Sequence, residues 1–174
     1  MSAANADPGP AVVVMGVSAS GKSTVAATLA ARLGIPWADA DDLHPAANVA
    51  KMASGTPLDD DDRRPWLAAV GARLAEGAAS GGLVMACSAL KRTYRDQLRA
   101  SCPAAVFVHL DGSRALLAAR AGARQGHFMP PALLDSQLAA LEPLGPDERG
   151  VVVDIAQPGD EIAATAEKWV SARH

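Results

Sequence analysis

The sequence predicts a three-layer α/β fold, in which helices cover both faces of a mostly parallel central sheet. Short apolar runs rich in β-branched residues alternate with longer segments whose apolar residues recur every three or four positions. This alternation is typical of strand–helix–strand units. At 174 residues, 49% of them hydrophobic, the chain is long enough to bury one core. We therefore expect one domain over residues 11–174 and a flexible tail at residues 1–10.

The expected strands are short apolar runs, several with consecutive valines. In chain order they are AVVVM (11–15), IPWAD (35–39), LVMAC (83–87), AAVFVHL (104–110) and VVVDI (151–155).

The segments between these runs have apolar residues at helical spacing. The first expected helix ends at Gly34, and a short second one runs from His44-Pro45 to Gly55. A third covers 63–77, and Ser88 caps a fourth that carries Leu90, Tyr94 and Leu98. Two more cover 113–121 and 133–141, and the last carries Ile162 and Trp169. A segment rich in glycine and arginine interrupts the pattern at 122–129.

Charge and composition exclude several classes of protein. The net charge of −3 gives no indication of a basic surface and therefore argues against a nucleic-acid-binding protein. The first residues lack the basic and apolar regions of a signal peptide, and no apolar run approaches the roughly 18 residues of a membrane span. Cys87 and Cys102 have no metal-ligand spacing and are expected to be reduced thiols. These features predict a cytoplasmic protein without a membrane partner.

Ligands of parallel α/β folds bind beyond the carboxyl ends of the strands. The segments expected at that edge are 16–24, 39–44, 87–91 and 156–158.

The first of these segments, GVSASGKST, matches the phosphate-binding pattern G-x-x-x-x-G-K-[ST] between a strand and a helix. Gly16 and Gly21 let the backbone curl so that its N–H groups face phosphate oxygens. Lys22 is expected to reach the β- and γ-phosphates and to act in catalysis, and the Ser23 hydroxyl to ligate Mg²⁺. The predicted ATP-binding residues of this loop are Gly16, Val17, Ser18, Ala19, Ser20, Gly21, Lys22, Ser23 and Thr24.

The loop alone does not name the reaction. The guanine-recognition pattern N-K-x-D is absent, which argues against a GTPase. Asp111 and Asp154 each follow a predicted strand, but the run 83–87, the expected neighbour of the first strand, ends in Ala-Cys-Ser without an acid. Asp41 is therefore the better second magnesium ligand.

Asp39 and Asp41 follow the second expected strand and face the same way in an extended segment. One of them can accept a proton from an attacking hydroxyl or hold the metal, while the alternative is capping and turn formation. We predict Asp41 as the catalytic base and Asp39 as the residue that holds the loop.

The next helix places His44, Asn48 and Lys51 on one face, where they can bind hydroxyls and a carboxylate. A solvated helix face is the alternative. Ser88, Lys91 and Arg92 stand after another strand, and Arg92 also pairs with Asp96 at i, i+4.

Asp59–Asp62 raises a separate question, since four aspartates precede Arg63 and Arg64. The run lacks a calcium-loop pattern. We expect Asp61 or Asp62 to cap the helix over 63–77, with Pro65 in its first turn.

Several segments together resemble the gluconokinase family, within the P-loop kinases related to shikimate kinase. The matching segments, over residues 11–158, are MGVSASGKST, DLHPAANVAKMASGTPLDDDDRRPWL, CSALKRTYRDQLR, GHFMP with LLDSQLAALEP, and VVVDIAQP. The block that begins HP and ends PWL is specific to the family, whereas the phosphate loop is shared widely.

The resemblance implies a P-loop kinase fold with a lid at about 120–130 and an acceptor-binding region at about 39–78. It implies transfer of the ATP γ-phosphoryl group to the 6-hydroxyl of D-gluconate in carbohydrate metabolism, with Mg²⁺ as cofactor and a homodimer as assembly. The glycine-rich segment with Arg120 and Arg124 can itself close over the nucleotide and bring positive charge to the transferring phosphoryl group, with Arg124 acting in catalysis, while a mobile basic loop is the alternative. Arg63 or Arg64 would bind the gluconate carboxylate.

Further site residues follow from the same resemblance. ATP would also contact Arg120, Arg124, Gln157 and Pro158. Gluconate would contact Asp39, Asp41, His44, Asn48, Lys51, Arg64, Trp66, Ser88, Lys91, Arg92 and His127, and the metal would be held by Ser23 and Asp41.

The chain departs from the family at Ala19 and Ala40, where glycine is usual. Neither change removes a functional group. Two other functions remain as alternatives: a kinase of the same fold for another hydroxy-acid such as shikimate, and a nucleotide-binding switch without catalysis.

Overall fold

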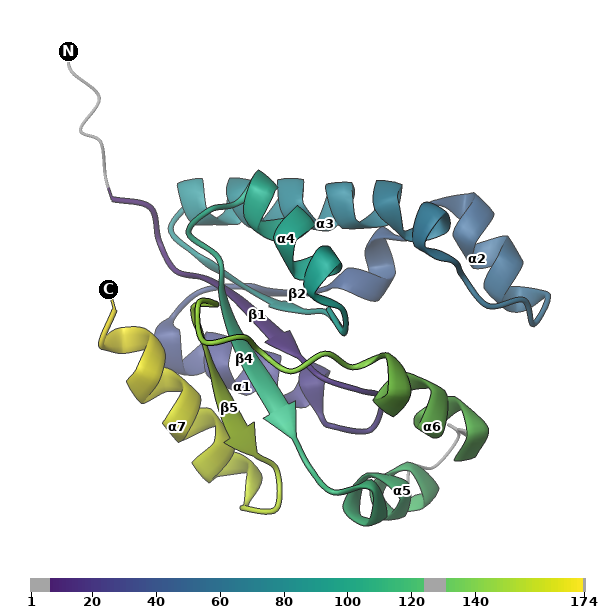
Figure 1. The fold of residues 1–174 in the computed structure, drawn as a ribbon. Helices are drawn as coiled ribbons and strands as arrows, with labels where there is room; N and C mark the ends of the chain where they lie inside the picture. The colour runs from purple at the N-terminus through teal and green to yellow at the C-terminus, as the bar shows by residue number, and fades with distance from the viewer. Residues whose placement is uncertain (1–6, 124–130, 174) are drawn as a thin grey trace.

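The computed structural model confirms the three-layer α/β fold and describes residues 7–123 and 131–173 (Figure 1). A five-stranded sheet has the order β2-β3-β1-β4-β5, and every neighbouring pair is parallel. The strands are β1 (Ala11–Met15), β2 (Trp37–Asp39), β3 (Leu83–Ala86), β4 (Val106–Asp111) and β5 (Gly150–Asp154). The expected pairing of the first and third strands is confirmed, with Val13 opposite Met85.

Helices lie on both faces of the sheet, with α1 and α7 on one side and α3 and α4 on the other, while α5 and α6 follow the carboxyl end of β4 (Figure 1). The helices are α1 (Lys22–Leu33), α2 (Ala46–Ala53), α3 (Asp60–Ala79), α4 (Arg92–Ser101), α5 (Arg114–Ala123), α6 (Pro131–Ala140) and α7 (Gly159–Ser171), with a short 3₁₀ helix, η1 (Ala40–Leu43), after β2. Among the described helices, none is both long and apolar enough to cross a bilayer.

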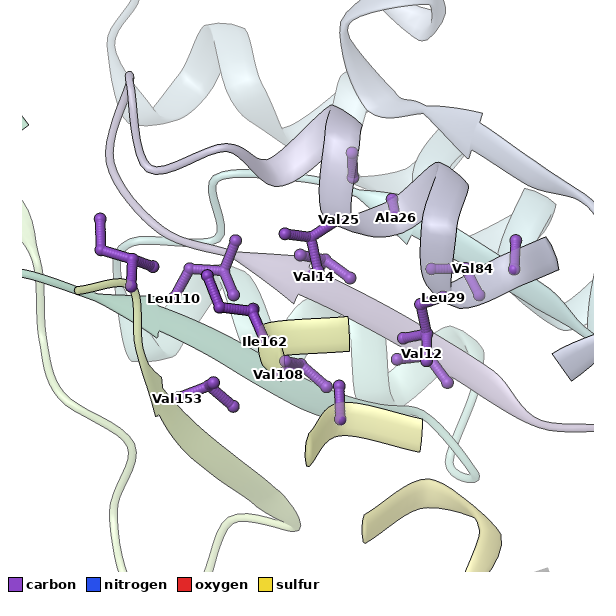
Figure 2. Packing of buried hydrophobic residues seen from close by; sticks show 14 of the residues in the cluster. Val12, Val14, Val25, Ala26, Leu29, Val84, Val108, Leu110, Val153 and Ile162 are labelled. Carbon is purple, nitrogen blue, oxygen red and sulfur yellow. The ribbon is translucent and has the colours of Figure 1, made fainter. Parts of the chain in front are cut away.

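Alternate residues of β1, β3 and β4 contribute to two separate apolar clusters. Val12 and Val14 of β1 pack with Val25 and Leu29 of α1, as Figure 2 shows, and helix α7 completes this cluster. The opposite cluster holds Val13 of β1 and joins β1 and β3 to α3 and α4. The sheet is therefore covered on both faces, and its carboxyl edge is left to carry the polar side chains.

Two helix beginnings differ from the sequence-based expectation. Asp59, rather than Asp61 or Asp62, caps α3, because the Asp59 side chain accepts the Asp62 N–H while the Asp62 side chain accepts the Asp59 N–H. The helix therefore starts at residue 60, and Pro65 lies in its second turn rather than its first. Lys91 rather than Ser88 precedes α4, and no side chain caps that helix.

The predicted tail and lid are only partly described. Gly9 donates a backbone hydrogen bond to Ala78, and the Pro10 carbonyl accepts one from Leu83, so these two residues are attached to the domain. Of the predicted lid, residues 120–123 belong to α5, and residues 124–130 lie outside the described residues.

Candidate active site

The loop between β1 and α1 depends on three residues with positive φ. Gly16 has φ 150°, and a Cβ there would come within 2.9 Å of the Leu110 carbonyl oxygen. Gly21 has φ 91° and directly precedes α1. Ala19 has φ 68°, a conformation that costs an L-residue roughly 1–2 kcal/mol. Alanine therefore stands at a position where the backbone conformation favours glycine, the residue that the family resemblance implies there.

Side chains of the loop fold back onto its own backbone. Ser20 Oγ donates to the Val17 carbonyl oxygen at 2.7 Å, and Lys22 Nζ lies 3.1 Å from the same oxygen. The first turn of α1 presents backbone N–H groups that have no partner within the helix. Together with the Lys22 ammonium, they form a positively polarised surface suited to phosphate.

The two predicted aspartates have different surroundings. Asp39 accepts hydrogen bonds through both carboxylate oxygens, from Ser23 Oγ at 2.8 Å and from the Asp41 backbone N–H at 2.9 Å. It thereby caps η1 and ties it to α1. In the described part of the chain, no hydrogen bond engages the Asp41 carboxylate. Burial raises the pKa of Asp41, and the negative charge of Asp39 raises it further. The charges of Lys22 and His44 oppose the rise.

A cavity of about 320 Å³ joins these groups at the carboxyl edge of β1, β2 and β3. Its lining residues are Ser18, Ala19, Gly21, Lys22, Ser23, Thr24, Asp39, Asp41, Ala86, Cys87, Ser88 and Gln137. The phosphate loop, both aspartates and Ser88 are thus brought together as expected from the strand ends. Asp111 and Asp154 end β4 and β5 and do not line this cavity.

Gln137 is a cavity residue that our sequence analysis missed. Its Oε1 accepts a hydrogen bond of 2.6 Å from the Ser18 backbone N–H. The available signal was a polar residue within the leucine-rich segment LLDSQLAAL of the predicted helix. Periodicity shows which face of that helix is apolar, but it cannot show that the polar face lies over a loop more than a hundred positions earlier.

His44 and Trp66 form a stacked pair with ring centroids 4.3 Å apart. Trp66 is 4% exposed and donates from its indole N–H to the Ala40 carbonyl oxygen at 2.7 Å. It therefore packs in the core and holds η1, and it meets the site through the His44 ring. Burial lowers the pKa of His44. The negative charge of Asp41 opposes this shift, and the positive charge of Arg63 adds to it.

The polar face of α2 contacts the beginning of α3. Asn48 is 4% exposed and donates to the Asp62 carbonyl oxygen at 2.9 Å, and its amide lies 3.3 Å from His44 Nδ1. Lys51 Nζ lies 2.5 Å from the Asp62 carboxylate, and this hydrogen bond holds the pKa of Asp62 below its ordinary value. Asn48 and Lys51 thus dock α2 onto α3, which neither the ligand-binding nor the solvated interpretation of this face included.

The Asp59–Asp62 run divides its carboxylates among different partners. Asp59 caps α3, and Asp62 pairs with Lys51. Asp60 accepts from Tyr94 Oη at 2.5 Å and lies 3.4 Å from Lys91 Nζ, while Asp61 pairs with Arg64. The run therefore acts as a cap and as a set of ion pairs.

Arg63 and Arg64 point to different parts of the surface. Arg63 donates to Tyr94 Oη at 3.3 Å and lines a cavity of about 460 Å³ together with Lys91 and Asp59–Asp61. Arg64 lines a separate cavity of about 210 Å³ between α3 and α4. Of the two arginines, Arg63 is the one that lies within electrostatic reach of His44.

Two arginines of α4 connect to the segment before β5. Arg95 is fully buried and forms a two-pronged ion pair with Glu148, and it also donates to the Ala89 carbonyl oxygen at 2.9 Å. Arg92 forms two hydrogen bonds with Asp147, whereas the predicted pair with Asp96 is longer, at 3.7 Å. Arg92 lines none of the three cavities described above.

The remaining predicted ATP contacts lie near the end of β5. Arg120 donates to the Ile155 carbonyl oxygen at 2.5 Å, Gln157 bonds the Asp154 carbonyl oxygen, and Pro158 precedes α7. The structure thus places Arg120 next to the segment with Gln157 and Pro158. Arg124 and His127 lie outside the described residues.

Both cysteines are buried and free. Burial raises the pKa of Cys87, in the wall of the main cavity, to about 12. Its thiol is therefore protonated at neutral pH and acts as a small apolar wall residue.

Comparisons with known proteins identify relatives of this chain. A family model described as an AAA domain matches residues 12–144. A gluconokinase of Gluconobacter oxydans is 55% identical over 138 residues, which cover 79% of this chain and 78% of the relative. The crystal structure of a gluconokinase from Sinorhizobium meliloti has a TM-score of 0.86 and 49% identity, and covers 96% of this chain and 94% of that one.

A more distant neighbour shares the fold alone. The shikimate kinase of Aquifex aeolicus superposes with a TM-score of 0.58 at 15% identity, and covers 93% of this chain and 96% of that one.

Proposed function

This chain belongs to the gluconokinase family, and we propose that it transfers the γ-phosphoryl group of ATP to the 6-hydroxyl of D-gluconate, giving 6-phospho-D-gluconate and ADP. The observation that carries the proposal is the single cavity in which Lys22 and Ser23 of the phosphate loop face Asp39 and Asp41. Groups for the phosphoryl donor and for the acceptor thereby lie in one cavity, as phosphoryl transfer requires.

The transfer is a displacement at phosphorus. The gluconate hydroxyl oxygen forms the new P–O bond, the bond to the bridging oxygen of ADP breaks, and the hydroxyl proton passes to a carboxylate. Asp41 suits this role because its carboxylate is not engaged within the described residues and its raised pKa makes it a stronger base than an ordinary aspartate. Asp39 is held by two hydrogen bonds and positions the loop.

The oxygen donors of the cavity fit a magnesium ion that arrives with ATP. Ser23 Oγ and the Asp39 carboxylate lie 2.8 Å apart, and Asp41 lines the same cavity. Ser23 with Asp41 is the predicted pair of ligands, and the contact between Ser23 and Asp39 adds Asp39 as a third candidate. When bound, the ion neutralises charge on the β- and γ-phosphate oxygens.

The acceptor carboxylate is proposed to bind near Arg63 and Lys91. Both cations line one cavity together with Asp59–Asp61, and the His44 ring is within electrostatic reach of both Asp41 and Arg63. An acid with a hydroxyl at its far end can then extend from the Arg63 guanidinium toward Asp41. Ser88 lines the main cavity as a further hydrogen-bonding group for the sugar-acid hydroxyls.

The test is an ADP-release assay with gluconate, shikimate, glycerate and nucleoside monophosphates as acceptors. Stoichiometric release with gluconate alone is the expected result. Release with shikimate instead would establish the alternative acceptor, and ATP binding without acceptor-dependent release would establish the non-catalytic switch.

We also propose a homodimer in the cytoplasm, as the family resemblance implies. Light scattering of the purified chain and fractionation of cells that express it test these two statements.

A further inference from the structure

Gln137 is a polar residue held over the phosphate loop by a helix from the far end of the chain. Helix α6 lies beside the loop that follows β1 (Figure 1). Leu134 of this helix is buried in the apolar cluster of α1 and α7, and Leu138 and Leu141 pack against the same cluster. This apolar contact fixes the helix, so the Gln137 carboxamide is held in place over the cavity.

The orientation of the carboxamide follows from its partner. A backbone N–H can only donate, so the atom that faces Ser18 at 2.6 Å is the amide oxygen. The amide nitrogen, with two N–H groups, therefore points away from Ser18. Within residues 7–123 and 131–173, no hydrogen bond engages this nitrogen, and Gln137 lines the main cavity.

One peptide group connects Gln137 to Lys22. The Val17 carbonyl oxygen lies 3.1 Å from Lys22 Nζ, and the N–H of the same Val17–Ser18 peptide donates to Gln137. The ammonium polarises the peptide and strengthens its N–H as a donor. Lysine at this position of the loop reaches the β- and γ-phosphates, so Gln137 lies at the terminal-phosphate end of the loop.

We propose that Gln137 is a substrate-contacting residue, which uses the Ser18 N–H to fix its carboxamide oxygen and donates from its amide nitrogen to an oxygen of the transferring phosphoryl group. The inference rests on the proposed function, since it assumes that ATP binds to the phosphate loop. Two neutral N–H donors add to the positive charge of Lys22 without a further charge to desolvate. A purely structural interpretation, in which Gln137 only docks α6 onto the loop, predicts different behaviour toward ATP and ADP.

The test compares binding of ADP with binding of the imido analogue of ATP by calorimetry, without gluconate. In Gln137→Met the donor is lost, and the dissociation constant of the analogue is expected to rise about tenfold or more, as for loss of a hydrogen bond to a charged group. The dissociation constant of ADP, which has no γ-phosphoryl group, should change less than twofold. Turnover should fall at least as much as analogue affinity.

Gln137→Glu separates the two functions of the side chain. It keeps an oxygen for the Ser18 N–H but replaces the donor with a carboxylate, so analogue binding should weaken more than in Gln137→Met, while the thermal midpoint stays at or above that of wild type. Gln97→Met on α4 is the matched control, because Gln97 bonds the Arg64 carbonyl oxygen and lies outside the main cavity.

Equal loss of analogue and ADP affinity in Gln137→Met would overturn the proposal and leave a docking role. Unchanged analogue affinity in either variant would overturn it as well. If Gln137→Met fails to fold, the ratio of analogue to ADP affinity in Gln137→Glu decides. Wild-type protein that binds both nucleotides without phosphorylating gluconate would refute the proposed function while leaving this test intact.

Discussion

The phosphate loop and the proposed acceptor-binding region hold their functional groups in different ways. The phosphate loop lines the cavity with residues from one short stretch between Ser18 and Thr24, and positive φ angles at Gly16, Ala19 and Gly21 set its shape. The side chains proposed to bind the acceptor come from η1, α2, α3 and the residues just before α2 and α4, and ion pairs and a stacked ring hold them together.

This difference predicts which substitutions each region tolerates. The phosphate loop depends on backbone φ angles and on the Lys22 cation. We therefore expect that no other residue compensates for the loss of Lys22. A side-chain network shares its charges among several partners, so that loss of one is partly offset by the others. The predictions below test this contrast, beginning with the largest expected effect.

Lys22→Ala should lower turnover by about a hundredfold or more, because Lys22 is the cation aligned with the charge that develops on the transferring group. Steady-state kinetics and a thermal midpoint measure the loss of activity and the retention of the fold. Lys168→Ala, at an exposed position of α7, is the control. Activity of Lys22→Ala within a few-fold of wild type would contradict the phosphate-loop assignment.

Asp41→Asn should lower turnover by about a hundredfold and leave ATP binding intact, because asparagine is nearly isosteric but cannot take the proton. Asp39→Asn should act more on stability and on acceptor affinity, since both Asp39 oxygens hold other groups. Kinetics and gluconate binding of both variants decide, and the reverse pattern would exchange the two roles.

The raised pKa of Asp41 leads to two further predictions, one for the wild-type protein and one for Asp41→Asn. Wild-type turnover should fall, as pH decreases, at a higher pH than the ordinary aspartate value of about 3.9 implies. A raised folded-state pKa also means that ionised Asp41 opposes folding above that pKa. Asp41→Asn should therefore raise the thermal midpoint at pH 7, and this gain should disappear below about pH 4. A lower midpoint at pH 7 would argue against the raised pKa.

Arg63→Ala should raise the KM for gluconate about tenfold, as expected for loss of a hydrogen bond to a charged group. Arg64→Ala is the matched control, with less than a twofold change, because Arg64 lines a different cavity. ATP affinity should be unchanged in both variants. A larger effect at Arg64 would assign the carboxylate to the other arginine.

The smallest effects concern the two alanines that replace family glycines, and they should have opposite signs. Ala19→Gly should raise the free energy of unfolding by about 1 kcal/mol, because φ 68° is unfavourable for alanine. Ala40→Gly should lower it by about 1 kcal/mol, because Ala40 is fully buried in η1 and its φ is negative. Urea denaturation measures both changes in the free energy of unfolding. Changes of the same sign would show that the φ angle does not determine the effect of glycine at these positions.

Local patterns in the sequence were enough to predict several elements of the fold. Valine runs placed β1 and β5 within one residue of their observed bounds, and the glycine spacing located the phosphate loop and both ends of α1. These features are encoded within a few consecutive residues, since β-branched side chains favour strands and glycine permits positive φ.

The tertiary structure alone decided which distant groups meet. It placed Gln137 on the Ser18 N–H and directed Lys51 to Asp62 rather than into the cavity. The cap of α3 is Asp59 and not, as the sequence predicted, Asp61 or Asp62. Adjacent aspartates are equivalent as caps in the sequence, and they differ only through tertiary partners such as Lys51 and Tyr94. Periodicity fixes the face on which a side chain lies, whereas its partner depends on how the helices pack against the sheet, which no local pattern contains.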